Sequence, residues 1–284
     1  MAETNHNVAS AKPDLASISG IVLALAGILG GLILEKGSIR DVAQITAALI
    51  VLGGTLGATL LNTPLTVLSG AFRRLNSVFL DRTLPPGGLI EEIIGYAAKA
   101  RKNGLVSLEQ EAQSIEDPFL SKALNLAVDG TDLQEIRKML ELEIGLEEQT
   151  AEAEAKVFES AGGYSPTIGI IGAVLGLIQV MKNLANIDEV GRGIAVAFVA
   201  TVYGVALANL FLLPAANKIK ARVYQDVQRK ELMLEGVIGI VEGLNPKLIR
   251  SKLEAYARSA PAAPGKAKQI KQDAAAGQPA RAEG

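Results

Sequence analysis

Cysteine and tryptophan are absent from the 284 residues, and histidine occurs once. Without cysteine the chain can form no disulfide, thiolate metal site or thiol nucleophile. His6 lies in a polar N-terminal stretch, so a histidine-centred triad or zinc site is not expected either. Neither sign of charge predominates, with 28 Lys and Arg against 30 Asp and Glu, which gives no reason to expect nucleic-acid binding. We find no phosphate loop, nucleophile–base pair or metal-ligand cluster, so we expect neither an enzyme nor a bound cofactor.

What the sequence does have is long apolar runs. Hydrophobic residues make up 49% of the chain, and the mean hydropathy is +0.29 although 20% of the residues are charged. Four runs lack Asp, Glu, Lys, Arg and His over the roughly 20 residues that a membrane-spanning helix needs. They favour four spans over the alternatives of buried core helices or a cleaved N-terminal signal. The runs are residues 15–34, 42–72, where Pro64 is expected to mark the membrane exit, 160–181 and 193–217.

The spans form two pairs with a large loop between them. The two short links within the pairs carry few basic residues, whereas Arg73, Arg74 and Arg82 follow the second span and Lys218, Lys220 and Arg222 follow the fourth. The positive-inside rule therefore predicts that the large loop and both termini are cytoplasmic. We expect six regions: a tail at 1–14, spans at 15–72, a cytoplasmic domain at 73–159, spans at 160–217, cytoplasmic helices at 218–258 and a disordered tail at 259–284.

The cytoplasmic loop has helical patterning and no strand-like alternation. A helical stripe after Leu89 ends at Asn103-Gly104, where the glycine is suited to a C-cap. Ser107 to Gln110 reads as a capping box, Pro118 suits the first turn of a further helix, and Thr131-Asp132 opens a long helix toward the third span. We therefore predict an all-α membrane protein with four transmembrane helices and a helical cytoplasmic domain between helices two and three.

The membrane spans contain hydroxyls, glycines and prolines but no ionisable carboxylate, Lys, Arg or His. A proton or cation path normally requires such a group, so a partner would have to supply it. Small residues four apart, such as Gly172 and Gly176, allow close helix packing. Pro166 and Pro214 lie near the cytoplasmic ends of the third and fourth spans, where each removes a backbone donor and permits a bend. Simple helix-end punctuation is the alternative for both prolines.

Together these features resemble the flagellar stator subunit family, motility protein A, over residues 15–256. The span layout with one large cytoplasmic loop is shared. The motifs that carry the resemblance are Lys99-Ala100-Arg101 with Gly104 and Ser107-Leu108-Glu109, Pro166-Thr167-Ile168-Gly169, Ala200-Thr201-Val202-Tyr203-Gly204 with Ala208-Asn209 and Pro214, and Glu235-Gly236 with Asn245-Pro246.

The resemblance implies a stator of the bacterial inner membrane. It implies a homo-oligomer, a pentamer around a dimer of motility protein B, whose membrane helix brings the aspartate that these spans lack. Protons or sodium ions cross at that interface, and the movement turns the rotor protein FliG. It also assigns residues: Arg101 and Glu109 would face the rotor, Pro166 and Pro214 would couple protonation to movement, and the ion path would include Thr201, Tyr203 and Ala173.

Ala173 bears on the coupling ion. Sodium-driven relatives usually carry a threonine there, seven residues after the third-span proline. Because dehydrating a metal cation requires oxygen ligands, the missing hydroxyl favours H+ over Na+.

Two alternatives stay open from the sequence. An ExbB/TolQ-type energiser would have about three spans, and a non-conducting membrane scaffold would equally lack intramembrane charge. Cell acidification, measured with a partner whose plug has been removed, would separate a conducting stator from a scaffold.

Overall fold

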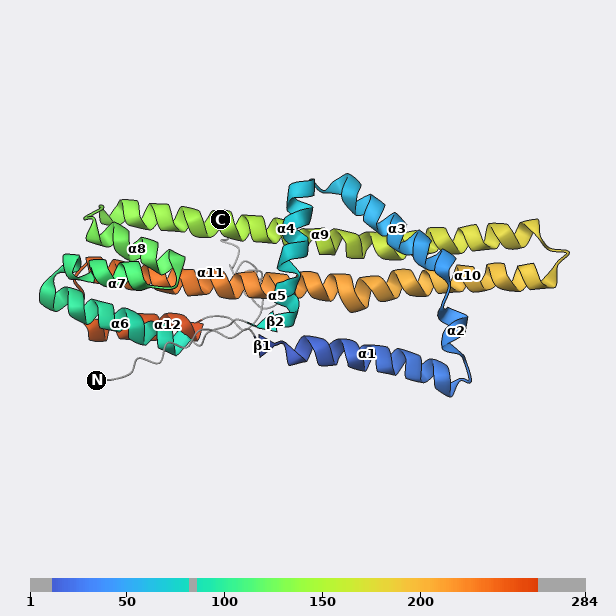
Figure 1. The fold of residues 1–284 in the computed structure, drawn as a ribbon, viewed down its shortest axis with the longest axis horizontal. Coiled ribbons are helices and arrows are strands. Elements are labelled where there is room, and N and C mark those ends of the chain that lie inside the picture. Colours follow the sequence, from blue (N-terminus) through green and yellow to red (C-terminus); the bar gives the residue numbers. More distant parts are fainter. Residues whose placement is uncertain (1–11, 82–85, 260–284) are drawn as a thin grey trace, which may run out of the picture. The chain divides into compact units, whose positions relative to one another are not determined.

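The computed structural model describes residues 12–81 and 86–259, and these are almost wholly helical (Figure 1). The exception is an antiparallel pairing of β1 (Lys12–Pro13) with β2 (Leu80–Asp81), which is too short to alter the all-α class. Arg82 and most of the tail expected to be disordered lie outside the described residues. The helices are α1 (Leu15–Leu34), α2 (Ile39–Val42), α3 (Ile45–Asn62), α4 (Leu65–Arg74), α5 (Asn76–Phe79), α6 (Pro86–Asn103), η1 (Leu105–Leu108), α7 (Glu109–Ser114), α8 (Pro118–Val128), α9 (Leu133–Lys182), α10 (Ile187–Ala206), η2 (Leu207–Leu212), α11 (Leu213–Val241) and α12 (Pro246–Ser259).

Four of the described helices are long and apolar enough to cross a membrane, as predicted. The first coincides with α1. The second is shorter than the apolar run that predicted it, because α3 ends at Asn62 and Pro64 takes the N-cap position of the separate helix α4. The third lies in α9, and the fourth extends from α10 through η2 into α11. Helix α3 therefore ends next to Pro64, the residue predicted to mark the membrane exit, because a proline cannot continue the hydrogen-bond ladder of the preceding helix.

Contacts divide the chain into two compact units. Unit 1 comprises residues 1–82 and 150–220, and unit 2 comprises residues 83–149 and 221–284. Helices α9 and α11 contribute residues to both units. The predicted boundaries at 72/73 and 159/160 separate membrane spans from the cytoplasmic domain. The division by contacts does not test them, so they stay a prediction.

Unit 2 is a helical bundle with a continuous apolar core. Its largest fully buried side chains come from five α-helices and from η1, because each element turns an apolar side inward. They are Ile93 of α6, Leu108 of η1, Leu120 and Leu124 of α8, Ile136 and Leu140 of α9, Met233 and Ile238 of α11, and Ile249 and Leu253 of α12.

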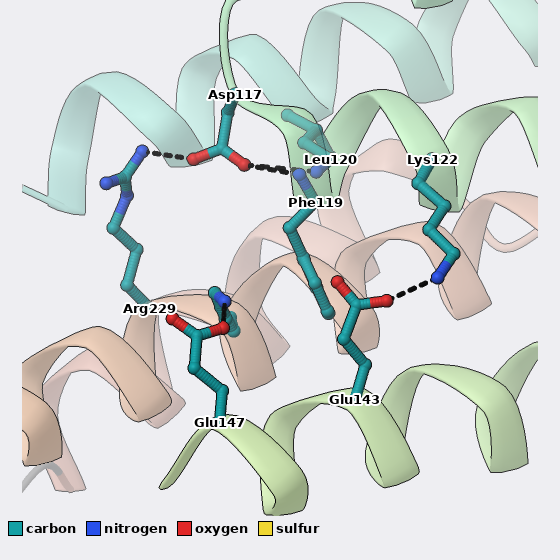
Figure 2. Close-up of polar contacts among 8 residues, drawn as sticks. Asp117, Phe119, Leu120, Lys122, Glu143, Glu147 and Arg229 are labelled. Atoms are coloured by element: carbon teal, nitrogen blue, oxygen red, sulfur yellow. Dashed lines mark hydrogen bonds and ion pairs between the residues drawn. The ribbon is translucent and has the colours of Figure 1, made fainter. Parts of the chain in front are cut away.

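Ion pairs fasten α8 to its neighbours at the edge of this core (Figure 2). Asp117 caps α8 by accepting from the Phe119 and Leu120 amides, and it also pairs with Arg229 of α11 at 2.6 Å. Lys122 of α8 pairs with Glu143 of α9. These contacts hold α8 against α9 and α11.

Two helix ends of unit 2 lie where the sequence predicted them, and one predicted helix start is wrong. Helix α6 ends at Asn103, and Gly104 has a φ of +84°, which glycine adopts without strain. Pro118 opens α8 as predicted. The capping box at Ser107 is wrong: its hydroxyl donates back to the Gly104 carbonyl at 2.7 Å, and the residue before α7 is Leu108, with no side-chain cap.

Candidate functional site

The membrane part of the site is the contact between α9 and α10, where glycines bring the two backbones together. A Cβ on Gly204 would lie 2.6 Å from the Ser165 carbonyl oxygen, and one on Gly169 would lie 2.9 Å from the Ala200 carbonyl oxygen. A Cβ on Gly176 would lie 2.8 Å from the Gly193 carbonyl oxygen. Only glycine permits this approach. The small residues spaced four apart in these two spans therefore form a contact between helices of the same chain.

Other small-residue pairs are not used in this way. A Cβ added at Gly27, Gly31, Gly53 or Gly57 would meet nothing within 4 Å. Small residues spaced four apart therefore lie in a close helix contact in one pair of spans and in open space in the other. The sequence did not distinguish these two cases.

Thr201 and Ala173 lie half-buried on α10 and α9 respectively. The Thr201 hydroxyl donates to the Ala197 carbonyl at 3.2 Å, within its own helix. Its oxygen keeps acceptor capacity beyond that bond. Between them, Gly172 and Ala200 mark the helix contact, since a Cβ on Gly172 would lie 2.7 Å from the Ala200 Cβ.

Tyr203 joins α10 to the break between α2 and α3. Its hydroxyl donates to the Val42 carbonyl at 2.5 Å and accepts from the Gln44 amide at 3.4 Å. Both backbone groups flank the break, where the Gln44 amide also donates to the Val42 carbonyl at 3.2 Å outside the regular helix ladder. In a membrane such groups are costly unless satisfied, so Tyr203 has a structural task whatever its part in ion movement.

The two prolines have different local settings. Pro166 lies inside α9, which continues through it as one helix. Pro214 is the second residue of α11, which directly follows the π-helical segment η2. A proline ring collides with the carbonyl four residues earlier, here Leu210, and a π turn widens the helix at that point. The sequence analysis missed η2, although Pro214 itself was a signal for an irregular turn.

The sequence analysis also missed Ser165, which precedes Pro166. Its side chain is fully buried, and its hydroxyl donates to the Gly204 carbonyl of α10 at 2.9 Å. No motif singles out a serine in an apolar run, so only the tertiary contact reveals it.

The second set of predicted residues lies in unit 2. Arg101 is in the last turn of α6, and Glu109 is the first residue of α7; both side chains are exposed. Neither forms an ion pair with a residue of the described ranges 12–81 and 86–259. Arg101 also lines a cavity of about 180 Å³ between the ends of α6 and α11, together with Ala97, Leu105, Ile240 and Leu244.

An ion pair close to these two residues along the chain joins α6 to α7. Lys99 of α6 pairs with Glu111 of α7. The hydrogen bond from Lys99 lowers the pKa of the Glu111 carboxyl below its usual value. Lys99 and Glu111 are thus neutralised by each other, whereas Arg101 and Glu109 present their charges to solvent.

The structure therefore assembles two groups of candidates. Thr201, Ala173, Tyr203, Pro166 and Pro214 belong to unit 1, and Arg101 and Glu109 belong to unit 2. In the described parts of the chain, no three His, Cys, Asp or Glu side chains gather where they could hold a metal ion.

Known proteins share both the sequence and the fold. Residues 111–232 match the MotA/TolQ/ExbB proton channel family, and residues 18–87 match the Motility protein A N-terminal family. Motility protein A of Bacillus subtilis (strain 168) is 35% identical over 244 residues, which cover 86% of this chain and 90% of that one. The structure of C. jejuni MotAB superposes with a TM-score of 0.82 at 33% identity, covering 86% of this chain and 95% of the other. The flagellar MotAB stator complex from Bacillus subtilis has a TM-score of 0.80 at 34% identity, covering 91% and 99%.

Proposed function

Because the chain belongs to the motility protein A family of flagellar stator subunits, we propose that it forms the ring of a stator around a motility protein B partner. The complex conducts protons across the bacterial inner membrane and converts the flux into torque on the rotor protein FliG. One observation carries the proposal: α9 and α10 pack tightly yet hold no carboxylate, Lys, Arg or His in their apolar core, so the titrating acid must come from another chain.

We propose protons as the coupled ion. A sodium ion leaving water requires several oxygen ligands at once. Ala173 offers none from its side chain, and Thr201 already donates its hydroxyl proton to Ala197. A partner carboxylic acid needs only one hydrogen-bond acceptor, which the Thr201 oxygen can provide. Motor speed that persists without sodium, and stops when the proton gradient collapses, is the expected result.

The orientation and the rotor contact follow from charge. Basic residues after the second and fourth spans support cytoplasmic termini and a cytoplasmic unit 2. Arg101 and Glu109 are exposed charges without an intramolecular ion pair in the described chain, which suits steering and register at a rotor surface more than affinity. A pentamer around a partner dimer would repeat this pair around the ring.

Pro166 and Pro214 are proposed as the coupling points. Each removes a backbone hydrogen bond from a span that would line the partner, so these turns bend at lower cost than an intact helix. Protonation of the partner acid would change its contact near Thr201 and displace the adjoining helix segments.

The decisive test is acidification of cells that express the chain with a partner whose plug has been removed. A stator gives a proton leak that requires both chains. Absence of a leak with both chains present in the membrane would favour a scaffold. The match of residues 18–87 to the Motility protein A N-terminal family speaks against the energiser alternative.

A further inference from the structure

Ser165 makes an unusual hydrogen bond for a serine in a membrane helix. Such hydroxyls commonly bond back to a carbonyl of their own helix. Thr59 does so to Thr55 at 2.8 Å, and Thr201 does so to Ala197 at 3.2 Å. Ser165 instead reaches across to the Gly204 carbonyl at 2.9 Å, and its side chain has no exposed surface.

The backbones around this bond are in direct contact. A Cβ on Gly204 would lie 2.6 Å from the Ser165 carbonyl oxygen and 3.1 Å from the Gly169 Cα. The serine hydroxyl and the glycine carbonyl therefore meet where the two helices can approach no further. Any relative shift of the helices at this level lengthens or breaks the bond.

The accepting carbonyl lies at the start of the irregular part of the fourth span. The Leu207 amide, which caps α10, donates to the carbonyls of Gly204 and Tyr203, and the π segment η2 begins there. Where an α-helix passes into a π turn, the backbone carbonyls accept from different amides than in the α-helix. The Ser165 hydroxyl, which donates to the Gly204 carbonyl from another helix, therefore stabilises the point at which α10 passes into η2. Pro214 follows at the other end of η2.

We infer that Ser165 is a positioning residue that links the two proline-bearing turns. Its hydroxyl ties the turn containing Pro166 to the carbonyl that leads into η2 and Pro214. Movement of one turn is thereby transmitted to the other. This inference rests on the proposed stator function and names the atom pair through which the coupling would pass.

The test compares three variants in the full complex with the partner. Ser165→Ala removes the hydroxyl, and Ser165→Cys keeps a weak donor of similar size. Thr167→Ala is the matched control, because Thr167 lies on the other side of Pro166 and its hydroxyl donates within its own helix, to Tyr164 at 2.7 Å. Each variant is measured for co-purification with the partner, for proton leak after plug removal, and for torque of single motors.

Loss of one interhelical hydrogen bond of average strength shifts a two-state population about threefold. We expect Ser165→Ala to lower torque by about that factor while assembly and proton leak stay at the parental level, Ser165→Cys to recover part of the torque, and Thr167→Ala to behave as the parent. Normal torque in Ser165→Ala overturns the inference. So does loss of assembly, which would make the serine a structural brace, or loss of the leak, which would put its hydroxyl on the ion path. If the parental complex itself gives no leak, the proposed function fails instead.

Discussion

Replacing Gly204 with alanine tests the contact between α9 and α10 directly. The new Cβ would lie 2.6 Å from the Ser165 carbonyl oxygen and 3.1 Å from the Gly169 Cα. Both are backbone atoms, so neither can rotate away as a flexible side chain would. Ordinary contact begins near 3.4 Å, so the helices must separate by about 0.8 Å at this level.

That separation has a calculable cost. It would stretch the 2.9 Å bond between Ser165 and Gly204 beyond hydrogen-bond range. Overpacking typically costs about 1–3 kcal/mol, and the lost interhelical bond adds about 0.6 kcal/mol. Alanine regains up to about 1 kcal/mol because it is the better helix former. The net destabilisation is about 1–3 kcal/mol, which corresponds to a fall in Tm of about 3–10 °C.

Gly163 provides the matched control. It lies on α9, the helix that Gly204 of α10 contacts, and it is exposed, so a Cβ there would meet nothing within 4 Å. Gly163→Ala should therefore stabilise the protein by up to about 1 kcal/mol, opposite in sign to Gly204→Ala. Thermal unfolding of the purified complex, followed by far-ultraviolet circular dichroism, measures both because the chain is strongly helical. Equal Tm values for the two variants would refute the close-contact argument.

Three further predictions concern charge and the backbone. Arg101→Glu should reduce swimming without reducing membrane insertion, because it inverts an exposed charge; unaltered motility in a strain without a second stator would remove Arg101 from the rotor contact. Pro166→Leu should stop rotation but not co-purification with the partner, since it restores a backbone donor to α9, and normal torque would show that the proline only punctuates the helix. Burial alone would raise the pKa of the Glu235 carboxyl, but its bonds to Lys252 and Arg137 outweigh burial and lower it. The ionised Glu235 carboxylate therefore stabilises the fold above the pKa that this group has in the unfolded chain, and this stabilisation is lost as the pH falls through its lower pKa in the folded protein. Glu235→Gln should cost about 1 kcal/mol of unfolding free energy at neutral pH and less in acid. A difference in chemical denaturation between the variant and the parent that does not change with pH would contradict this.

The membrane part could be read largely from composition. Charge-free runs of sufficient length predicted four spans because a bilayer tolerates few charges, and α1 begins and ends where its run does. In the second run, Pro64 predicted the end of the span, and α3 ends two residues before it because proline restricts the backbone locally. In unit 2, Gly104 and Pro118 marked helix ends correctly because their backbone restrictions act locally.

The sequence by itself determined the helical class, the number of spans, the absence of an intramembrane acid and the helix ends at Gly104 and Pro118, because these depend on local backbone preference and on transfer from water to lipid. Only the tertiary structure decided which glycines form a contact within the chain, that Tyr203 spans the break before α3, that a π segment precedes Pro214, and that Ser165 bonds across to Gly204. Those outcomes depend on distances between residues far apart in the chain, and spacing along one helix carries no information about what lies opposite it.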